Sequence, residues 1–549
     1  MIPSSIHRKN TKRFVALPTV KAAITVSLVL AIIILAYNFW PILIYALAEQ
    51  GNNRLETPGW QNAQTTLAAA QPTYRSTYTY YKLQKDQNLE WAARYFGVSV
   101  LTLQNLNPGH PIWGVTIKIP PVQNPLPPFP PSQATTTGVS VTTDTTGAMF
   151  ISNPFDSPTV YLTIPSLMQI LQPYGAITQL GQKSFLINRP IFIQNNIITD
   201  ITSSTVQNLY LLSNPNYHIT TLSFWNSEAL LSGVTVTSYD TVTKQPDTNY
   251  KDGRSFLRAY GSARMDILNS TISYLGMNKL QASNKLPQTS QWLAPQKGIN
   301  GVSWSIDDKS YGIDDTTGWV ENTIFKHNYG GALTYGAQGM IWRNNVFVAN
   351  IMYGLDAKSN SNNATVIDNR FIKNGGNGFV ASGQSDYNTI KNNISSENKS
   401  NGYALLNNAN LNILKSNISI SNRNDFVISS SCLDTILNNA SYNPIGSQLR
   451  ISNSSIQNYV INNKFYGGQI GVYLYGGING AEITNNTFDN VSYQLLTHGA
   501  TRVLFAGNQS NKLGYKLAKG DQVVFGINKL KRRVSVSMPQ LNTNANMKN

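Results

Sequence analysis

Asparagine recurs at a nearly constant interval through the second half of this 549-residue chain. Successive members of the series are 22, 23 or 24 residues apart, and most of them lie between a short apolar run and an apolar or aromatic residue. A period in the twenties with short alternating strands predicts a solenoid in which each repeat forms one coil. The series is Asn322, Asn345, Asn369, Asn393, Asn417, Asn439, Asn463, Asn486 and Asn508.

The repeat favours a mainly β fold, a right-handed parallel β-helix. Leucine-rich repeats share the period, but their Leu-x-x-Leu-x-Leu framework is absent. Asparagine tolerates the left-handed backbone of a sharp turn, and equivalent asparagines of stacked coils can hydrogen-bond in a ladder, so we interpret the series as structural. The helix is predicted to be right-handed, because connections between parallel strands of one sheet are right-handed. A second register of glycines runs in phase with the first: Gly330, Gly354, Gly378 and Gly402.

Residues 150–270 are expected to form the irregular N-terminal coils of the same solenoid. The segment 162–171 is predicted to form a helix that covers the open end. The segment 278–296 interrupts the repeat, and we expect it to leave the coil as a loop beside a groove.

The N-terminal region predicts export. Cationic residues precede an apolar stretch at 22–48, which exceeds the roughly 20 residues needed to cross a bilayer. A retained anchor is favoured over a signal peptide cleaved near Ala48, because the apolar region of a signal peptide is shorter. Cys432 is the only cysteine, which excludes a disulfide framework and a cysteine-based zinc site, and no cofactor or metal is expected.

Residues 77–122 have a strand–helix–helix–strand pattern, with Asn88 and Ser99 as helix caps. The phrases Tyr81–Leu89, Ala92–Ser99, Leu106–Pro108 and Ile117–Pro120 resemble the LysM domain, a module that binds N-acetylglucosamine-containing glycans. The resemblance implies a peptidoglycan anchor, although a spacer that kept only the fold remains open. The glycan-binding residues that it implies are Lys85, Asp86, Gln87, Asn88, Asn107 and Pro108.

A proline-rich and threonine-rich stretch separates this unit from the solenoid, and it favours extended, flexible structure. The expected segments are a cytoplasmic basic segment at 1–21, a membrane anchor or signal segment at 22–48, a linker at 49–76, the LysM-like domain at 77–122, a linker at 123–148, the β-helix at 149–515 and a basic C-terminal tail at 516–549.

The formal net charge is +16, which favours a polyanionic partner. An acidic polysaccharide fits this charge and an exported protein, whereas nucleic acid is not expected without an aromatic RNA-binding motif. The basic run 529–533 is either part of such a surface or a solvated tail.

Several stretches resemble the periplasmic, β-helical mannuronan (alginate) C5-epimerases. The resemblance spans about residues 160–510 and is carried by Ser232–Asp240, Asp252–Ala259, Ile272–Gly276, Ser310–Ile313, Thr317–Trp319, Asn322–Phe325, Asn328–Gly330, Tyr335 and Asn350–Asp356. It implies an isomerase that binds a polyuronate. Epimerisation at C5 requires a base and an acid on opposite faces of the sugar and a cation that neutralises the carboxylate.

The catalytic motif departs from that family. The family's Asp-Pro-His-Asp motif reads Asp356-Ala357-Lys358-Ser359, and Gly383 stands where the family's carboxylate-binding arginine would fall. Lys358 is therefore a catalytic base, a cation for the substrate carboxylate, or a surface lysine. Tyr335 and Tyr353 match family tyrosines and either stack on sugar or pack. A lone His327 nearby is interpreted as structural.

The resemblance thus leaves three functions open. The first is polyuronate binding, with or without epimerisation, at Asp356, Lys358, Tyr335 and Tyr353. The second is a lyase that uses Ca²⁺ at the aspartate pairs 307–308 and 314–315. The third is a cell-wall scaffold anchored by the inner membrane and peptidoglycan. The expected location is the inner membrane with the folded part facing the periplasm, or the periplasm or exterior after cleavage.

Overall fold

The computed structural model describes residues 136–154, 157–214, 218–251, 253–277, 300–305, 316–512 and 514–530, with parts of 79–119 and a few residues between 125 and 134. The chain divides into two compact units, Met1–Gln71 and Pro72–Asn549, of which the first lies outside the described residues. The predicted membrane segment at 22–48 falls there. In the part of the chain that is described, no helix is long and apolar enough to cross a membrane.

Two strands frame the described part of residues 79–119. Strand β1 (Thr79–Lys82) pairs antiparallel with β2 (Thr116–Ile119). The described residues between them include helical positions at 89, 92, 103 and 106. The core contains Leu83, Leu89, Ala92, Leu103, Ile117 and Ile119.

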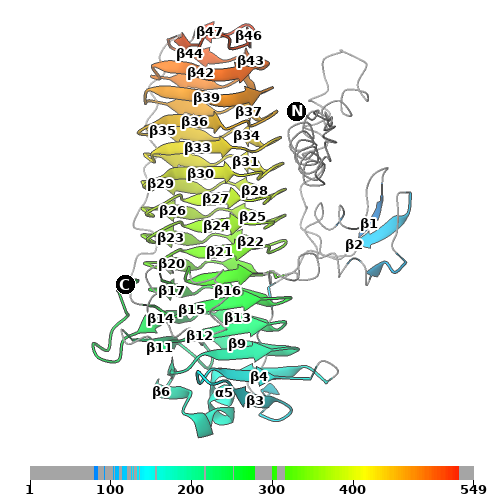
Figure 1. Ribbon diagram of the computed structural model, residues 1–549, viewed down its shortest axis with the longest axis vertical. Coiled ribbons are helices and arrows are strands. Elements are labelled where there is room, and N and C mark those ends of the chain that lie inside the picture. The colour runs from blue at the N-terminus through cyan, green and yellow to red at the C-terminus, as the bar shows by residue number, and fades with distance from the viewer. Residues whose placement is uncertain are drawn as a thin grey trace, which may run out of the picture. The chain divides into compact units, whose positions relative to one another are not determined.

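The rest of the described chain winds into coils that contribute in turn to three long, almost wholly parallel sheets (Figure 1). Sheet 1 contains β3 (Ser140–Thr143), β4 (Met149–Ser152), β8 (Ile191–Gln194), β12 (Thr221–Trp225), β15 (Phe256–Tyr260), β18 (Val302–Ser305), β21 (Ala332–Tyr335), β24 (Leu355–Lys358), β27 (Phe379–Ser382), β30 (Asn401–Leu406), β33 (Asn424–Ser429), β36 (Ser447–Ser452), β39 (Ile470–Asn479), β42 (Tyr493–Thr501) and β45 (Tyr515–Lys516).

Sheet 2 contains β5 (Val160–Thr163), β9 (Ile197–Thr202), β13 (Glu228–Ser232), β16 (Arg264–Leu268), β19 (Trp319–Glu321), β22 (Ile341–Arg343), β25 (Thr365–Ile367), β28 (Thr389–Lys391), β31 (Ile413–Lys415), β34 (Thr435–Leu437), β37 (Tyr459–Ile461), β40 (Glu482–Thr484), β43 (Val503–Ala506) and β46 (Val523–Phe525).

Sheet 3 contains β6 (Ile177–Gly181), β7 (Ser184–Ile187), β10 (Asn208–Asn214), β14 (Thr235–Tyr239), β17 (Thr271–Ser273), β20 (Ile324–Lys326), β23 (Val346–Val348), β26 (Arg370–Ile372), β29 (Ile394–Ser396), β32 (Ile418–Ile420), β35 (Ala440–Tyr442), β38 (Lys464–Tyr466), β41 (Thr487–Asp489), β44 (Gln509–Ser510) and β47 (Lys529–Leu530), and β11 (His218–Ile219) pairs with β10. The coils thus confirm the predicted parallel β-helix. Their first parallel strand begins at Met149, after the antiparallel β3, and they continue past residue 515.

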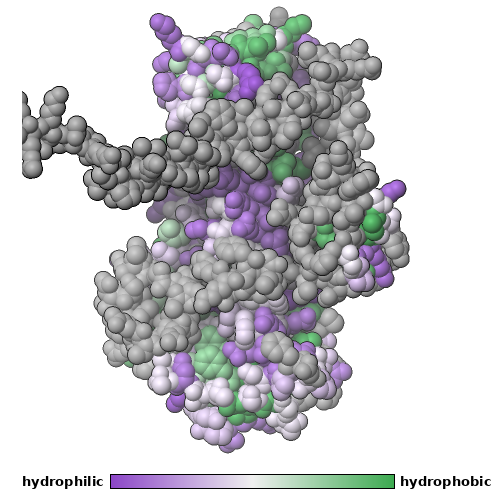
Figure 2. Space-filling view, turned by 45° about the vertical axis from the view of Figure 1, so that its right-hand side comes forward, coloured by the Kyte–Doolittle hydropathy of each residue, from purple (hydrophilic) through white to green (hydrophobic). Residues whose placement is uncertain are grey.

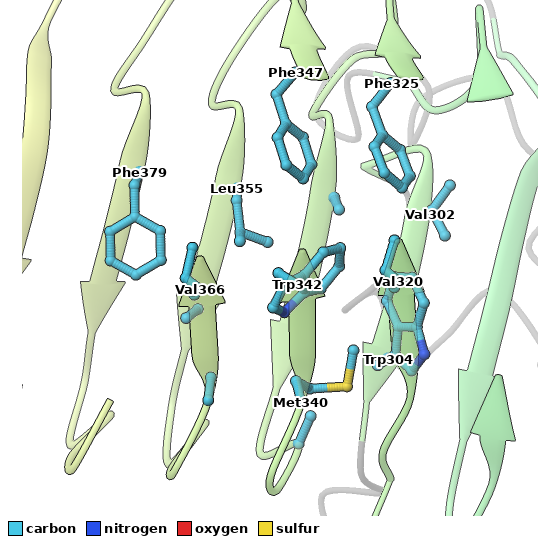
Figure 3. Packing of buried hydrophobic residues seen from close by; sticks show 14 of the residues in the cluster. Val302, Trp304, Val320, Phe325, Met340, Trp342, Phe347, Leu355, Val366 and Phe379 are labelled. Carbon is cyan, nitrogen blue, oxygen red and sulfur yellow. The ribbon is translucent and has the colours of Figure 1, made fainter. Parts of the chain in front are cut away.

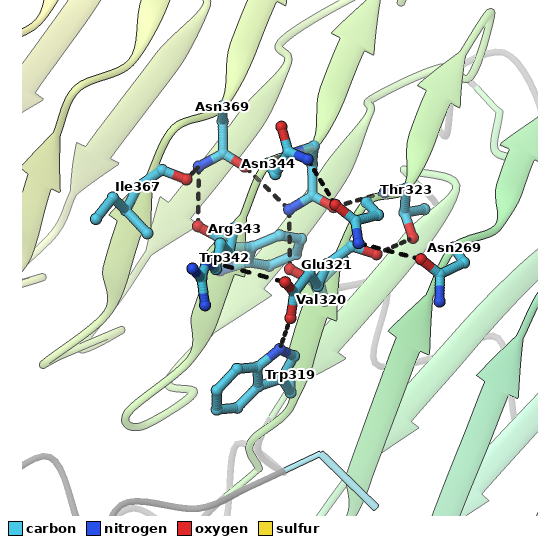
Figure 4. A network of polar contacts seen from close by, with 12 residues as sticks. Asn269, Trp319, Val320, Glu321, Thr323, Trp342, Arg343, Asn344, Ile367 and Asn369 are labelled. Atoms are coloured by element: carbon cyan, nitrogen blue, oxygen red, sulfur yellow. Dashed lines mark hydrogen bonds and ion pairs between the residues drawn. The ribbon is translucent and has the colours of Figure 1, made fainter. Parts of the chain in front are cut away.

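Most of the repeating asparagines lie inside the solenoid, on the turn between sheets 2 and 3. In each coil the side-chain Nδ2 donates to Oδ1 of the next, as from Asn369 to Asn393 and from Asn393 to Asn417, each at 3.0 Å. Asn369 Nδ2 also donates to the carbonyl of Trp342 (Figure 4). The ladder satisfies turn carbonyls and amides that are cut off from water.

The left-handed residue is not the one that the periodicity predicted. It precedes the ladder position in each coil, for example Asn344 at φ 52° and Asn392 at φ 57°. Only Asn322 of the predicted series has this backbone conformation itself, and Thr323 takes the ladder position of that coil. The hydrogen-bonding role of the series is therefore confirmed, and the left-handed turn is supplied by its neighbour.

Aromatic stacks fill the interior next to the ladder (Figure 3). Phe325, Phe347 and Phe371 occupy equivalent positions of β20, β23 and β26, with centroid separations of 4.8 and 5.2 Å. These distances match the spacing of neighbouring strands, so each ring stacks on the next. Trp342 packs edge-on against Trp304 in the same core.

The predicted helix is confirmed at the N-terminal end of the solenoid. Helix α5 (Ile164–Ile170), capped by Thr163 and followed by a 3₁₀ turn at Gln172–Tyr174, buries Ile164 and Leu167 against the first coils. Some exposed side chains at the opposite end are apolar, and a green group lies beside hydrophilic residues at the top of Figure 2. Val524, Ile527 and Leu530 are exposed in that last coil.

Candidate functional site

The predicted site lies on the outer surface of sheet 1, where the sequence Leu-Asp-Ala-Lys forms β24. Leu355 and Ala357 point into the core, so Asp356 and Lys358 point outward. Lys358 is exposed, whereas only 7% of Asp356 is exposed although it lies on the outer face. The alternation of the strand therefore brings a nearly buried carboxyl and a solvated ammonium to one surface.

Strand register places Tyr335 beside Lys358. Tyr335 of β21 is the direct partner of Lys358, and Leu333 is the partner of Asp356. Neighbouring strands lie about 4.8 Å apart, so the tyrosine and the lysine are adjacent side chains. On the other side, β27 offers Val380 and Ser382. The register thus brings Tyr335 and Lys358 together.

Tyr353 approaches the same carboxyl from the turn before β24. Burial raises the pKa of its phenol, and the charge of Asp356 and the phenol of Tyr329 add to the rise. Its ring also packs against the apolar residues Val380, Ala404 and Val427. Tyr353 therefore packs on the sheet and lies within electrostatic reach of Asp356, and its stacking on a sugar stays a prediction.

The electrostatics of Asp356 distinguish it from a surface carboxylate. Burial raises the pKa of this carboxyl to about 6, and the ammonium of Lys358 opposes part of the rise. Near neutral pH the group can therefore give or accept a proton within a small change of pH. The raised pKa follows from burial and distinguishes Asp356 from a solvated carboxylate.

Three further tyrosines and an arginine lie at or beside this face, and no sequence motif assigned them a role. Tyr329 packs against Tyr250 with ring centroids 5.7 Å apart. Arg258 of β15 donates from Nε to Ser305 Oγ at 3.1 Å and lies 4.4 Å over the ring of Tyr260. Arg258 could have been found from its alternation with buried Leu257 and Ala259, which aims it outward.

Other predicted residues do not join the site. His327 stacks on Tyr274, the equivalent turn residue of the preceding coil, at 5.1 Å, which supports its structural interpretation. Burial and the charges of Lys326 and Arg254 lower the pKa of this histidine. Gly383 has φ 64° in the turn after β27, so this position serves the turn.

The LysM-like residues are only partly described. Lys85, Asp86, Gln87 and Asn88 lie outside the described residues. Asn107 makes a structural contact, because its side chain accepts from the backbone N–H of Lys118 at 2.6 Å and donates to the carbonyls of Leu103 and Lys118. Pro108 is exposed beside it. Asn107 therefore ties the second helical segment to β2.

No group of three or more His, Cys, Asp or Glu side chains that could hold a metal ion occurs among the described residues. The aspartate pairs 307–308 and 314–315 lie outside them. The calcium interpretation therefore has no described ligands.

Comparisons with known proteins agree with this architecture. The family model of the right-handed β-helix region matches residues 300–441, and that of the periplasmic copper-binding protein NosD matches residues 377–510. The segment matched by the latter contains one histidine, His498, and one cysteine, Cys432, on different turns of the chain, and no methionine. These residues do not fit a copper site, which requires clustered imidazole or sulfur ligands.

A search of curated proteins finds no match. Among solved structures, the periplasmic alginate epimerase AlgG has 17% sequence identity and a TM-score of 0.55, over 70% of this chain and 85% of that chain. A variant of AlgG gives 18% identity and a TM-score of 0.52 over the same shares. The A-module of the Azotobacter vinelandii mannuronan C-5 epimerase AlgE6 gives 12% identity and a TM-score of 0.34, over 69% and 92%. The chain is therefore a right-handed parallel β-helix protein with the fold of the periplasmic alginate epimerase.

Proposed function

We propose that this protein binds an acidic polysaccharide such as alginate along the outer face of sheet 1, at Tyr335, Tyr353, Asp356 and Lys358. The observation that carries the proposal is the nearly buried Asp356 carboxyl, with a pKa of about 6, on one strand with an exposed ammonium and within electrostatic reach of Tyr353. The fold shared with AlgG supports it, since AlgG is an alginate epimerase.

Each side chain has a chemical part in binding. The ammonium of Lys358 pairs with a uronate carboxylate, and the half-buried ring of Tyr353 contacts the apolar face of a pyranose ring, while the buried Tyr335 supports Lys358. The protonated form of Asp356 donates a hydrogen bond to the sugar, and its ionised form accepts one from a hydroxyl. A chain of sugars running along the sheet would meet these groups on successive coils.

The same residues also suggest how C5 epimerisation would proceed. The two pKa values favour separate roles, because Asp356 is largely ionised at neutral pH while the raised pKa of Tyr353 keeps its phenol protonated. Asp356 would accept the C5 proton, and the electron pair of the C5–H bond would pass into the carboxylate paired with Lys358. Tyr353 would return a proton to the opposite face, and solvent would restore both groups.

The test is to incubate the full chain with polymannuronate and to measure binding and product together. We expect saturable binding that Lys358→Gln weakens, while Lys391→Gln, a lysine of β28 on sheet 2, leaves it unchanged. Proton NMR would detect epimerisation as a change in the mannuronate-to-guluronate ratio without shortening. Equal binding by the two lysine variants, or no binding by the wild type, overturns the proposal.

The other functions have different products. A lyase generates unsaturated, ultraviolet-absorbing ends. A scaffold changes neither the mannuronate-to-guluronate ratio nor the chain ends, and it sediments with peptidoglycan. Loss of turnover in Asp356→Asn and Tyr353→Phe with retained binding would assign the proton transfers, and unchanged turnover would remove both residues from the reaction.

We further propose that the solenoid faces the periplasm and is anchored in the inner membrane by residues 22–48, with residues 77–122 on peptidoglycan. AlgG and NosD are described as periplasmic, which supports this location. Membrane fractionation and N-terminal sequencing of the mature chain distinguish an anchor from cleavage near Ala48.

A further inference from the structure

A second group of polar and aromatic side chains lies on the same face, nearer the C-terminus. Arg450 and Ser452 point outward from β36, because they alternate along the strand with Leu449 and Ile451, which belong to the core. Tyr473 and Tyr475 point outward from the next strand, β39. The register pairs Arg450 with Tyr473 and Ser452 with Tyr475, so the four side chains occupy the corners of a square.

Two polar atoms of this square lack a partner in the described protein. Arg450 Nε is buried and makes no hydrogen bond, and neither does the buried Oγ of Ser452, a fully buried residue. On the preceding strand, Ser429 Oγ accepts from Asn453 Nδ2 at 2.8 Å, so a serine of this column can be satisfied within the protein. Buried polar groups without partners are uncommon in folded proteins and require an explanation.

The two tyrosines form an ordered aromatic surface beside these atoms. Their rings stack with centroids 5.2 Å apart and an interplanar angle of 24°, and both side chains are half-buried. The strand continues past Tyr475 into an irregularity at Gly476 and Gly477, both with positive φ, which ends the flat surface there. The exposed His498 borders it as the next residue in register after Tyr475.

We propose that Arg450, Tyr473 and Tyr475, beside the buried Ser452, form a second subsite, which binds a uronate unit of an acidic polysaccharide. The guanidinium fits a carboxylate through two parallel N–H···O bonds. A tyrosine ring contacts the apolar face of the pyranose. The identity of the ligand as an acidic polysaccharide rests on the proposed function. The arrangement of the four side chains does not depend on it.

The distance between the two subsites suits one polymer chain. Asp356 and Arg450 lie in the same column of sheet 1, separated by Val380, Ala404 and Val427, so four strand spacings of about 4.8 Å give about 19 Å. This length is that of several sugar units. A long chain would occupy both subsites at once, and the second contact would be intramolecular, which raises the affinity beyond that of either subsite.

The experiment compares a mannuronate trimer with polymannuronate by isothermal titration calorimetry on the full chain. The variants are Arg450→Gln, Lys358→Gln and their combination. Arg343→Gln is the matched control, because Arg343 is an exposed arginine of sheet 2 in an ion pair with Glu321. Circular dichroism and thermal unfolding establish that each variant is folded, and Arg450→Lys and Ser452→Ala serve as milder second variants.

We expect the trimer to bind at two sites in the wild type and at one in Arg450→Gln, with polymer affinity reduced at least about tenfold by the loss of the second contact. Lys358→Gln should retain an Arg450-dependent trimer site, and the combination should bind none. A neutral mannose trimer should not bind at the Arg450 square.

The two proposals can fail separately. Trimer binding that Lys358→Gln abolishes and Arg450→Gln leaves equal to Arg343→Gln overturns the second subsite and retains the first. Arg450-dependent binding that is indifferent to Lys358 retains the second and overturns the first. Equal binding of the neutral trimer overturns carboxylate recognition.

Discussion

One buried carboxyl interrupts an asparagine ladder, and replacing it with the amide should stabilise the fold. Asp434 occupies the column of Asn388, Asn412 and Asn458, on the turn between sheets 1 and 2. Its Oδ1 accepts from Asn412, but its Oδ2 is buried without a partner. Burial raises the pKa of Asp434 well above its usual value, and the backbone N–H of Asn412 only partly opposes this.

The expected gain in Asp434→Asn follows from these contacts. An asparagine can donate to Asn458 Oδ1, as Asn388 donates to Asn412 at 3.0 Å, which contributes about 1 kcal/mol. Removing the unpaired carboxylate oxygen relieves a further ~1–3 kcal/mol. The free energy of unfolding at pH 7.5 should therefore rise by about 2–4 kcal/mol.

The gain must depend on pH with a definite sign. Because the folded-state pKa of Asp434 is raised, the wild type is not penalised below the unfolded-state pKa near 3.8, and it loses stability as pH rises from there through the folded-state pKa. The advantage of Asp434→Asn should thus be largest above neutrality. Near pH 3.5 it should shrink to the hydrogen-bond contribution of about 1 kcal/mol.

Urea unfolding followed by tryptophan fluorescence at the two pH values measures both quantities. Asn458→Asp is the reciprocal control, because it replaces the Nδ2 that donates to the Ser431 carbonyl at 3.0 Å and should destabilise the fold at pH 7.5. An Asp434→Asn variant no more stable than the wild type at pH 7.5, or an equal gain at both pH values, would refute the reasoning.

Three further predictions concern the core, the main ladder and the site. Phe347→Ala opens a cavity in the ring stack and should lower the free energy of unfolding by about 3–5 kcal/mol, whereas Phe347→Leu should cost less than about 1.5 kcal/mol, both measured by denaturant unfolding. Asn393→Ala leaves the backbone N–H of Asn369 without its acceptor and should cost about 3 kcal/mol by the same assay, a value that a loss below 1 kcal/mol would contradict. Polymannuronate should bind more tightly, by roughly tenfold, as pH falls through about 6, because Asp356 loses its negative charge, and calorimetry on Asp356→Asn should show this dependence removed.

The periodicity predicted the architecture because one requirement is repeated in every coil. An amide at the turn must bond the coil above and the coil below, so Asn369, Asn393 and Asn417 recur at the same interval. The periodicity could not distinguish this position from the preceding left-handed residue, since Asn344 and Asn345 are both asparagine.

A residue that departs from the repeat in only one coil could not be predicted from the periodicity. Asp425 takes the corner position that Gly354, Gly378 and Gly402 hold elsewhere, and its carboxyl turns inward to accept from Ser419, Asn422 and Ser441. Burial raises the pKa of Asp425 to about 6. No repeat predicts such an exception, because it is visible only when the facing side chains are known.

The site could be predicted only in part. Asp356 and Lys358 alternate with core residues of a short strand, so their outward direction follows from the sequence. The burial of Asp356, and the adjacency of Tyr335 and Lys358 in particular, depend on the register between coils. Arg450 and Tyr473 are 23 residues apart and adjacent in space, a relation that the resemblance to one family's motif did not include.

The asparagine ladder has a nearly constant spacing. The number of coils can therefore change without a change in the residues that form each coil. Each member bonds a partner that is 24 residues away through most of the series. A duplication or deletion of one whole repeat therefore reconnects every amide with an equivalent amide. Coils of 22 and 23 residues keep the same bond, as from Asn417 to Asn439 and from Asn463 to Asn486, so a difference of one or two residues is taken up elsewhere in the coil. Insertion or deletion of whole repeats would lengthen or shorten the outer surface in uniform steps. The distance between two binding sites on that surface could then change while the residues of each site stay the same.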